Sequence, residues 1–230
     1  MSNSKKIILC SASPRRQMLL REIGVDFEIR TKDVNETFPD SLKGEQIAIY
    51  LAEKKTNVFL QKISNHETIL TADTIVWLND RMLGKPSDKP EAIEMLKELS
   101  GNKHTVYTAV CIADKSEQKI ISASSEVYFR KLSAEEILFY VEHFNPLDKA
   151  GAYGAQECLP KGMNPCSTEE IEFLSRINKT EIIERSINKS ENMVDAIKKI
   201  DGSFFNVMGL PLQEVYMALK SANIFETVKQ

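Results

Sequence analysis

Two neighbouring arginines near the N-terminus fall where the sequence predicts the start of a helix. In the segment CSASPRRQMLL (residues 10–20), Ser13 is a favoured N-cap residue and Pro14 suits the first helical position. Arg15 and Arg16 therefore lie in the first turn, where the unpaired N–H groups and the helix dipole favour anions over cations. A phosphate-bearing ligand would offset this unfavourable placement. The alternative is that both arginines are solvated surface charges.

A single aspartate interrupts an otherwise apolar strand. Asp73 lies in the middle of TILTADTIVWL (Thr68–Leu78). A buried carboxylate is unfavourable by several kcal/mol, roughly, unless it is paired, hydrogen-bonded or bound to a metal. We therefore interpret Asp73 as functional, the alternative being an aspartate that caps a loop at the strand end. Thr74, beside it, could offer its hydroxyl group to a ligand.

Four further polar residues complete a set that could bind a polyphosphate. Lys85 lies between a glycine and a proline, Lys54 on a predicted helix, Glu36 in an acidic loop, and Gln156 at the end of a glycine-rich run. Each could also be an ordinary loop or surface residue. The three histidines are scattered, which argues against a histidine-based catalytic triad. Cations with a few carboxylates suit a polyphosphate held with a divalent metal and attacked by water.

Strands and helices alternate in the first half of the chain, and antiparallel pairs are predicted in the middle. This pattern predicts an α/β fold with a mixed sheet. We expect strands at Lys6–Leu9, Asp26–Thr31, Thr68–Leu78, Arg81–Leu83, His104–Asp114, Lys119–Phe129 and Ser203–Val207. We expect helices at Pro14–Ile23, Lys43–Gln61, Pro90–Leu99, Ser133–Phe144, after a capping box at Ser167–Glu170, at Glu191–Ile200 and at Leu212–Ser221.

Composition excludes several classes of protein. The 230 residues carry a net charge of −3, which argues against a general nucleic-acid binder. The four cysteines lack CxxC spacing, so neither a zinc site nor a disulfide framework is indicated. We expect no secretory leader, because no apolar region of that kind follows Met1, and no apolar run approaches membrane-spanning length. We therefore expect a cytoplasmic protein with no nucleic-acid or membrane partner.

Six motifs occur in the order seen in the Maf family, which the chain resembles from Lys6 to about Leu219. They are SASPRRQ (Ser11–Gln17), ADTIV (Ala72–Val76), GKP (Gly84–Pro86), LSG (Leu99–Gly101), LDKAGAYGAQ (Leu147–Gln156) and NVMGLPL (Asn206–Leu212). The resemblance implies one domain over residues 1–230. Its fold would be an elongated mixed sheet with flanking helices and two lobes around a cleft, similar to the inosine triphosphate pyrophosphatases.

The resemblance also implies an activity, which is hydrolysis of a nucleoside triphosphate at the α–β bond to a monophosphate and pyrophosphate. The variants ADTIV and AGAYGAQ are similar to the branch that acts on dTTP and UTP, and on modified pyrimidine nucleotides, in house-cleaning of nucleotide pools. Asp73 matches the proton acceptor for the attacking water. A divalent cation, Mg²⁺ or Mn²⁺, is implied, with Glu36 and Asp73 as its ligands. The implied substrate-binding residues are Ser13, Arg15, Arg16, Glu36, Lys54, Thr74, Lys85 and Gln156.

The chain departs from the family pattern at about residues 157–199, where it carries an additional segment. Its capping box and amphipathic stripe predict helices that pack on the surface. The segment could instead form a lid or extend a homodimer interface. Two other functions stay open at this point. One is a pyrophosphatase for 7-methyl-GTP or another nucleotide, and the other is a regulatory inhibitor of septum formation that acts by binding.

Overall fold

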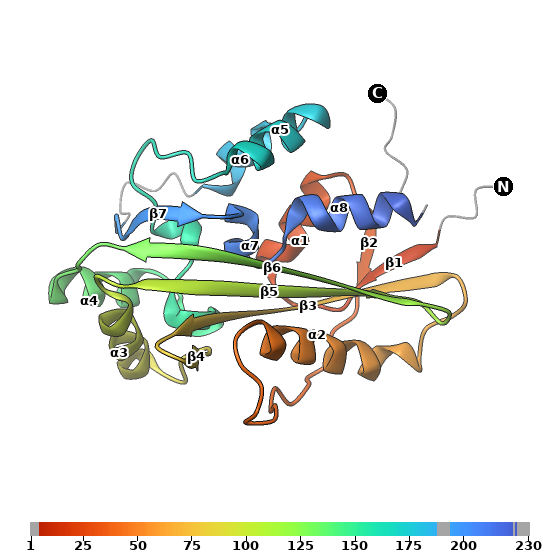
Figure 1. The fold of residues 1–230 in the computed structure, drawn as a ribbon, viewed down its shortest axis with the longest axis horizontal. Helices are drawn as coiled ribbons and strands as arrows, with labels where there is room; N and C mark the ends of the chain where they lie inside the picture. The colour runs from red at the N-terminus through yellow and green to blue at the C-terminus, as the bar shows by residue number, and fades with distance from the viewer. Residues whose placement is uncertain (1–4, 188–193, 223, 225–230) are drawn as a thin grey trace. The chain divides into compact units, whose positions relative to one another are not determined.

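The computed structural model describes residues 5–187, 194–222 and 224, and it confirms the predicted α/β fold with a mixed sheet (Figure 1). In this part of the chain seven strands form one sheet in the order β2-β1-β3-β5-β6-β7, with β4 paired to β3. The strands are β1 (Lys6–Leu9), β2 (Phe27–Ile29), β3 (Glu67–Leu78), β4 (Arg81–Leu83), β5 (Lys103–Ala113), β6 (Gln118–Phe129) and β7 (Ile197–Asp201).

Helices connect and flank these strands. The α-helices are α1 (Pro14–Glu22), α2 (Glu45–Leu60), α3 (Lys89–Leu99), α4 (Ala134–His143), α5 (Thr168–Arg176), α6 (Glu181–Ser186), α7 (Phe204–Met208) and α8 (Leu212–Ser221). Three 3₁₀ turns follow α4, namely η1 (Pro146–Asp148), η2 (Ala150–Ala152) and η3 (Ala155–Glu157). None of the helices in the described ranges has the length and apolar character needed to cross a bilayer.

The chain divides into two compact units. Unit 1 comprises residues 1–73, 108–123 and 209–230, and unit 2 comprises residues 74–107 and 124–208. The boundary within β3 falls between Asp73 and Thr74, so two adjacent candidate residues belong to different units. The predicted cleft between two lobes stays a prediction.

Unit 1 is built on parallel strands with helices on both faces. Strand β1 runs parallel to both β2 and β3, and Leu9 is aligned with Leu70. Side chains of β3 alternate between the two faces. Thr71 contacts α2, whereas Thr68 lies on the side of α8. Figure 1 shows α2 and α8 on opposite sides of the strands. The fully buried Ile8, Leu9 and Leu70 lie in the core between these layers.

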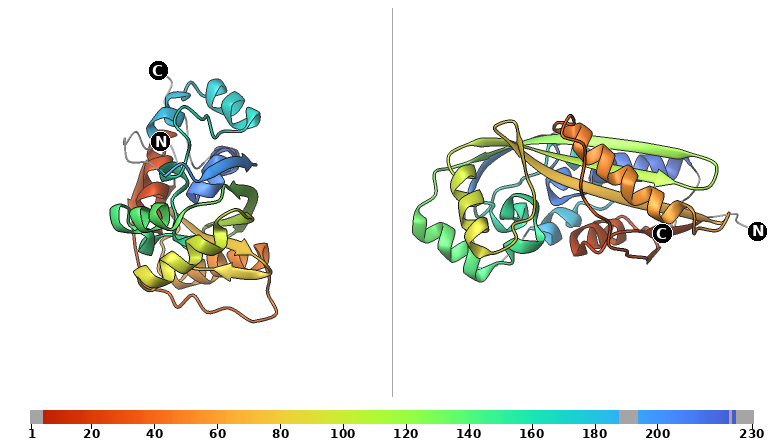
Figure 2. Two further views of the ribbon diagram at one scale, coloured as in Figure 1. Left: turned by 90° about the vertical axis from the view of Figure 1, so that its left-hand side faces the viewer. Right: turned by 90° about the horizontal axis from the view of Figure 1, so that it is seen from below.

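Unit 2 contains the antiparallel end of the sheet. Strand β4 pairs antiparallel with β3, and β7 pairs antiparallel with β6. Helix α3 packs against α4 and against the turns η1 and η2. Figure 2 shows α3 (yellow) and α4 (green) near each other in both views. A buried aromatic cluster joins β5, β6 and the segment after η2 through His104, Phe129 and Tyr153, whose rings meet edge to face. This cluster anchors the glycine-rich segment that carries Gln156.

Two predicted elements are wrong. The segment Ser203–Val207, predicted as a strand, is instead the start of helix α7. Ser203 begins this helix because its hydroxyl oxygen accepts a hydrogen bond from the Asn206 N–H at 2.9 Å. The predicted helix at Glu191–Ile200 is also wrong over its described part, because Ile197–Asp201 forms strand β7 against β6. Residues 191–193 of that prediction lie outside the described residues.

The two ends of the additional segment are hydrogen-bonded to each other. The Cys158 carbonyl oxygen accepts hydrogen bonds from the Ala196 N–H at 3.1 Å and from the Ile197 N–H at 2.9 Å. The start of β7 is thus fastened directly behind η3. Of the described inserted residues, Phe173, Leu174 and Ile182 are buried within unit 2.

Glu170 attaches the additional segment to α7. Its carboxylate accepts hydrogen bonds from the Ser203 hydroxyl at 2.6 Å, the Phe204 N–H at 3.0 Å and the Phe205 N–H at 3.2 Å. It also completes the capping box of α5 with Ser167, as the sequence predicts. One buried side chain therefore satisfies the first turns of two helices.

Candidate active site

Asp73 lies just beyond the parallel part of the sheet in unit 1. The Cys10 N–H donates to the Leu70 carbonyl at 2.8 Å, so the segment that follows β1 runs beside the strand that carries Asp73. Ligands of α/β proteins characteristically bind beyond the carboxyl ends of parallel strands. The Asp73 side chain is only 8% exposed. Its carboxylate therefore needs partners from the surrounding elements.

The segment after β1 forms the helix start that the sequence predicts. The Ser13 hydroxyl accepts a hydrogen bond from the Arg16 N–H at 3.4 Å. The Arg16 guanidinium donates through Nε to the Gly209 carbonyl at 2.8 Å and through Nη1 to the Ala72 carbonyl at 3.0 Å. Arg16 therefore ties the first turn of α1 both to the residue before Asp73 and to the turn before α8.

Burial of the Arg16 guanidinium changes its pKa. Burial lowers the pKa of Arg16 to about 10. The Asp73 carboxylate opposes this lowering, and the positive charge of the neighbouring Arg15 lowers the pKa further. Both arginines are half-buried in the same helical turn. The helix start therefore carries the two arginines that the sequence predicts there. In addition, Arg16 holds neighbouring segments together through its hydrogen bonds to the Gly209 and Ala72 carbonyls, which the sequence does not reveal.

Lys55 of α2 is the lysine that contacts Asp73. Its ammonium group forms ion pairs with the Asp73 carboxylate and, at 2.8 Å, with Glu36. Lys54, the residue chosen from the sequence, donates instead to the Thr37 carbonyl at 2.7 Å and to the Thr37 hydroxyl at 3.2 Å. One residue along a helix is a rotation of about 100°. The structure therefore places Lys54 away from Asp73.

A buried threonine pair fixes the position of α2 on the sheet. The hydroxyl groups of Thr56 and Thr71 are 2.7 Å apart, and the Thr71 hydroxyl donates to the Ala52 carbonyl at 2.9 Å. Thr71 and Asp73 are two residues apart on one strand and share a face. The spacing along the sequence does not separate the two lysines, because Lys54 lies three residues and Lys55 four residues after the buried Leu51, and both spacings place side chains on one face.

The environment of Asp73 is strongly charged. Burial raises its pKa, and the charges of Lys55 and Arg16 oppose this rise, while Glu36 adds to it. Glu36 is largely exposed, with 49% of its side-chain surface accessible. The cluster therefore contains a buried carboxylate (Asp73), an exposed carboxylate (Glu36) and two cations, Arg16 of α1 and Lys55 of α2. Perturbed carboxyl groups of this kind are typical of proton acceptors in catalysis.

Unit 2 holds three further candidates, Lys85, Thr74 and Gln156, each on a different segment. Lys85 is exposed on the turn after β4, and the Gly84 carbonyl beside it accepts from the Gly151 N–H at 2.9 Å. Gly151 has a φ of +68°, and a Cβ there would lie 2.9 Å from Cγ2 of Val76. Only glycine fits both constraints. Thr74 shares the strand face of Val76, so the glycine-rich segment packs on the face of β3 that carries Thr74.

Gln156 lies on η3 with its side chain partly buried. Its amide nitrogen is 3.5 Å from the Glu157 carboxylate. Within the described part of the chain its amide oxygen is buried and has no hydrogen-bond partner. Helix α7, to which Glu170 attaches the additional segment, contacts η3.

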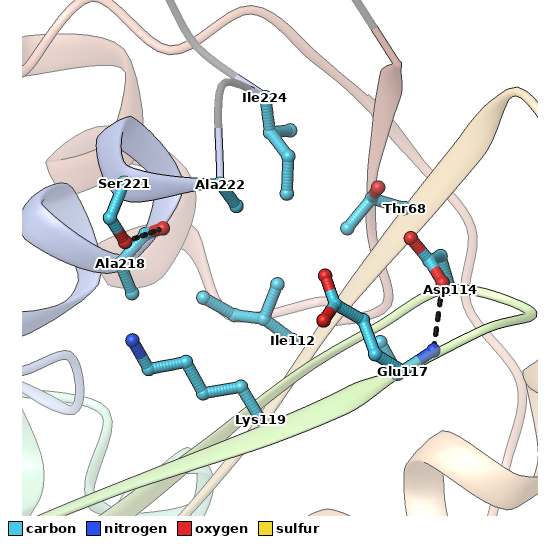
Figure 3. A pocket seen from close by; sticks show the side chains of 10 residues that line it. Thr68, Ile112, Asp114, Glu117, Lys119, Ala218, Ser221, Ala222 and Ile224 are labelled. Atoms are coloured by element: carbon cyan, nitrogen blue, oxygen red, sulfur yellow. Dashed lines mark hydrogen bonds between the residues drawn. The ribbon is translucent and has the colours of Figure 1, made fainter.

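A separate pocket of about 230 Å³ lies between α8 and strands β5 and β6 in unit 1 (Figure 3). Figure 3 shows the Glu117 carboxylate directed toward its middle, with Ile112 and Ile224 beside it. The residues that line it include none of the candidates described above. The pocket is therefore distinct from the cluster around Asp73.

Comparison with known proteins identifies relatives over nearly the full chain. The dTTP/UTP pyrophosphatases of Bacteroides fragilis (strain YCH46) and Bacteroides thetaiotaomicron are each 40% identical over 216 residues, covering 94% of this chain and 95% of each relative. That of Christiangramia forsetii is 38% identical over 215 residues, covering 94% of this chain and 93% of the relative.

Among solved structures, the Staphylococcus aureus Ham1 protein matches with a TM-score of 0.38 and 18% identity, covering 54% of this chain and 72% of that one. The family model described as Maf-like protein matches residues 6–170. This match spans more than half of the chain, and it includes Asp73 and the residues around it. The chain therefore belongs to the Maf-like protein family.

Proposed function

We propose that this protein hydrolyses dTTP and UTP between the α and β phosphates, giving the nucleoside monophosphate and pyrophosphate. The names of its relatives, at about 40% identity over most of the chain, support this substrate class. The observation that carries the proposal is the buried Asp73 carboxylate in contact with the Lys55 ammonium group and close to the Arg16 charge. This combination offers a proton acceptor beside cations that can bind phosphate.

In the proposed reaction Asp73 accepts a proton from the water that attacks phosphorus. Burial raises the affinity of this carboxylate for a proton, as a general base requires. Lys55 holds the carboxylate in place and supplies positive charge next to it. Because the negative charge on the phosphates shifts as the bond to the leaving pyrophosphate breaks, preorganised cations stabilise the transition state.

Further predicted phosphate ligands lie at the start of α1 and on the turn after β4. Ser13 and Arg15 belong to the helix start in unit 1, where the N–H groups of the first turn can also bind an anion. Lys85 extends from the turn after β4 in unit 2. We propose that Lys55 takes the place given to Lys54 by the sequence, and that Arg16 acts mainly by positioning the residues around Asp73.

The donor set fits a divalent cation bound together with substrate. No group of three or more metal-binding side chains occurs in the described ranges. Glu36 and Asp73 nevertheless share the Lys55 ammonium group, so their carboxylates approach the same point. Mg²⁺ typically binds one or two carboxylates together with substrate phosphates. Glu36 and Asp73 would hold this cation, which would supply charge neutralisation at the phosphates.

We propose that Arg15, Thr74 and Gln156 select the base. The experiment is pyrophosphate release by the wild-type protein, with Mg²⁺ or Mn²⁺, from dTTP, UTP, CTP, GTP, ATP and 7-methyl-GTP. We expect dTTP and UTP to give the highest kcat/KM values, with pyrophosphate and monophosphate as products. A preference for 7-methyl-GTP would contradict the proposed substrates. Absence of turnover with every nucleotide would favour a binding role instead.

A further inference from the structure

The side chain of Glu157, the residue after Gln156, contacts three other side chains of unit 2. Its carboxylate accepts a hydrogen bond from the Tyr140 hydroxyl on α4. Its Oε1 atom lies 3.5 Å from the Lys149 ammonium group and 3.5 Å from the Gln156 amide nitrogen. The side chain is only 14% exposed. Glu157 thus meets three donors, and an ionised carboxylate can only accept from them.

The surroundings hold Glu157 in one position. The Tyr140 hydroxyl, which donates to Glu157, itself accepts from the Gly154 N–H at 2.9 Å. A Cβ on Gly154 would lie 2.8 Å from Oε2 of Glu157 and 3.0 Å from Cε of Lys149. The absence of a side chain on Gly154 therefore lets both charged side chains lie directly over its backbone. The start of β7, hydrogen-bonded to the carbonyl of residue 158, fastens the chain immediately behind Glu157.

This arrangement determines which way the Gln156 amide faces. An amide has a donor NH₂ end and an acceptor oxygen end. If Gln156 turned its oxygen toward Glu157, two acceptors would face each other, so the NH₂ end is held there. The amide oxygen is then left buried without a partner in the described part of the chain. Buried acceptors are nearly always hydrogen-bonded, so this oxygen is suited to a donor supplied by a ligand.

Resting on the proposed function, we propose that Glu157 is a positioning residue that fixes the Gln156 amide in the orientation that reads uracil and thymine. These bases carry an N3–H donor next to a C4 carbonyl. The fixed amide complements them, because its oxygen can accept from N3–H and its second N–H can donate to the carbonyl. Cytosine presents the reverse pattern, with an acceptor at N3 and an amino donor at C4. Reading cytosine would require a reversed amide, whose oxygen would face Glu157.

The test compares kcat/KM for UTP and for CTP in wild type, in Glu157→Gln, in Gln156→Ala and in the double variant. A glutamine at position 157 can present either end of its amide, so Gln156 is free to reverse. A site that hydrogen-bonds one base strongly rejects the base with the opposite pattern. We expect the UTP-to-CTP ratio to fall about tenfold in Glu157→Gln, the size of effect typical for one hydrogen bond. Glu142→Gln, which alters an exposed glutamate of α4, should leave the ratio unchanged.

The double variant separates positioning from a merely structural role. If Glu157 acts through Gln156, Glu157→Gln should change the ratio in the wild-type background and leave it unchanged in the Gln156→Ala background. An equal change in both backgrounds, or no change in either, would overturn the inference.

A second measurement needs no variant, which keeps the inference testable if Glu157→Gln does not fold. Wild-type protein is assayed with 3-methyl-UTP, which lacks the N3–H donor. We expect at least a tenfold lower kcat/KM than for UTP, and equal values would overturn the inference. These outcomes are distinguishable from failure of the proposed function, which would appear as no pyrophosphate release from UTP or dTTP by wild type. In that case both proposals fall.

Discussion

The surroundings of Asp73 differ from those of Gln156. Charged side chains are buried around Asp73, whereas the segment that carries Gln156 is held by close packing of its backbone and by the contacts of one side chain, Glu157. In unit 1 a buried carboxylate, a lysine and an arginine meet, and burial changes the pKa values of Asp73 and Arg16 in opposite directions. In unit 2 the glycine-rich segment is held by Gly151 against Val76 and by Gly154 beneath Glu157. The first region can stabilise changing charge, and the second can hold hydrogen-bonding groups still. This difference is what we expect if the first region carries out the proposed phosphate chemistry and the second the proposed base selection.

Of the four changes that test this comparison, replacement of Lys55 should have the largest effect. Lys55→Ala removes the cation that contacts both Asp73 and Glu36. We expect kcat/KM for UTP to fall by about 10²–10³, the usual effect of losing one preorganised charge-stabilising group. Lys54→Ala, the matched control one residue away, should change kcat/KM less than about threefold. Pyrophosphate release measures both, and equal losses in the two variants would contradict the assignment of Lys55.

Removal of Glu170 should weaken the attachment of the additional segment to α7, near Gln156, and leave the region around Asp73 unchanged. Glu170→Ala leaves the buried N–H groups of Phe204 and Phe205 without acceptors. We expect the free energy of unfolding to fall by about 2–4 kcal/mol, as for other buried hydrogen-bonded networks. Urea unfolding measures this loss, with Glu169→Ala at the exposed neighbouring position as control. An unchanged free energy of unfolding would show that this attachment of the additional segment is not stabilising.

Gly154→Ala tests whether close packing holds the second region. The new Cβ would lie 2.8 Å from a Glu157 oxygen, so the Glu157 side chain must move. We expect a loss of about 1–3 kcal/mol in the free energy of unfolding, typical of overpacking. Gly84→Ala is the matched control, because its Cβ would meet nothing closer than Met82 Cε at 3.7 Å. Equal stability of both variants would contradict the close-packing account.

The smallest effect concerns the buried His104 that anchors the second region through Tyr153. Burial lowers the pKa of His104 to about 3, whereas an unfolded histidine titrates near 6.5. As the pH falls below 6.5 the unfolded chain binds a proton that the folded chain does not, so stability is lost. We expect the free energy of unfolding of wild type to fall between pH 7 and pH 5.5 by about 1 kcal/mol more than that of His104→Gln. Parallel losses in both proteins would contradict the lowered pKa.

Local motifs were sufficient to predict much of both regions. The helix start at Ser13 and Pro14, the buried Asp73 and the turn at Lys85 depend on residues next to one another in the chain. Lys55 could not be distinguished from Lys54 in this way, because the position of α2 depends on Thr56 meeting Thr71 across the core.

The errors near the C-terminal end have the same kind of cause. Ser203–Val207 has the composition of a strand, yet the buried Glu170 carboxylate accepts hydrogen bonds from this segment, and it becomes α7. Strand β7 likewise depends on pairing with β6, although its charged sequence resembles a surface helix. The partners that decide these structures are distant in the chain, and single-segment patterns do not contain them.

The most direct test of the account is the rate of pyrophosphate release from UTP by Asp73→Asn. This variant keeps the size of the side chain and removes its capacity to accept a proton. We predict a loss of at least about 10³ in kcat, measured on protein whose cooperative melting transition shows that it is folded. Asp80→Asn, at the exposed turn after β3, should retain wild-type turnover. Wild-type turnover in a folded Asp73→Asn protein would contradict the central role given to Asp73.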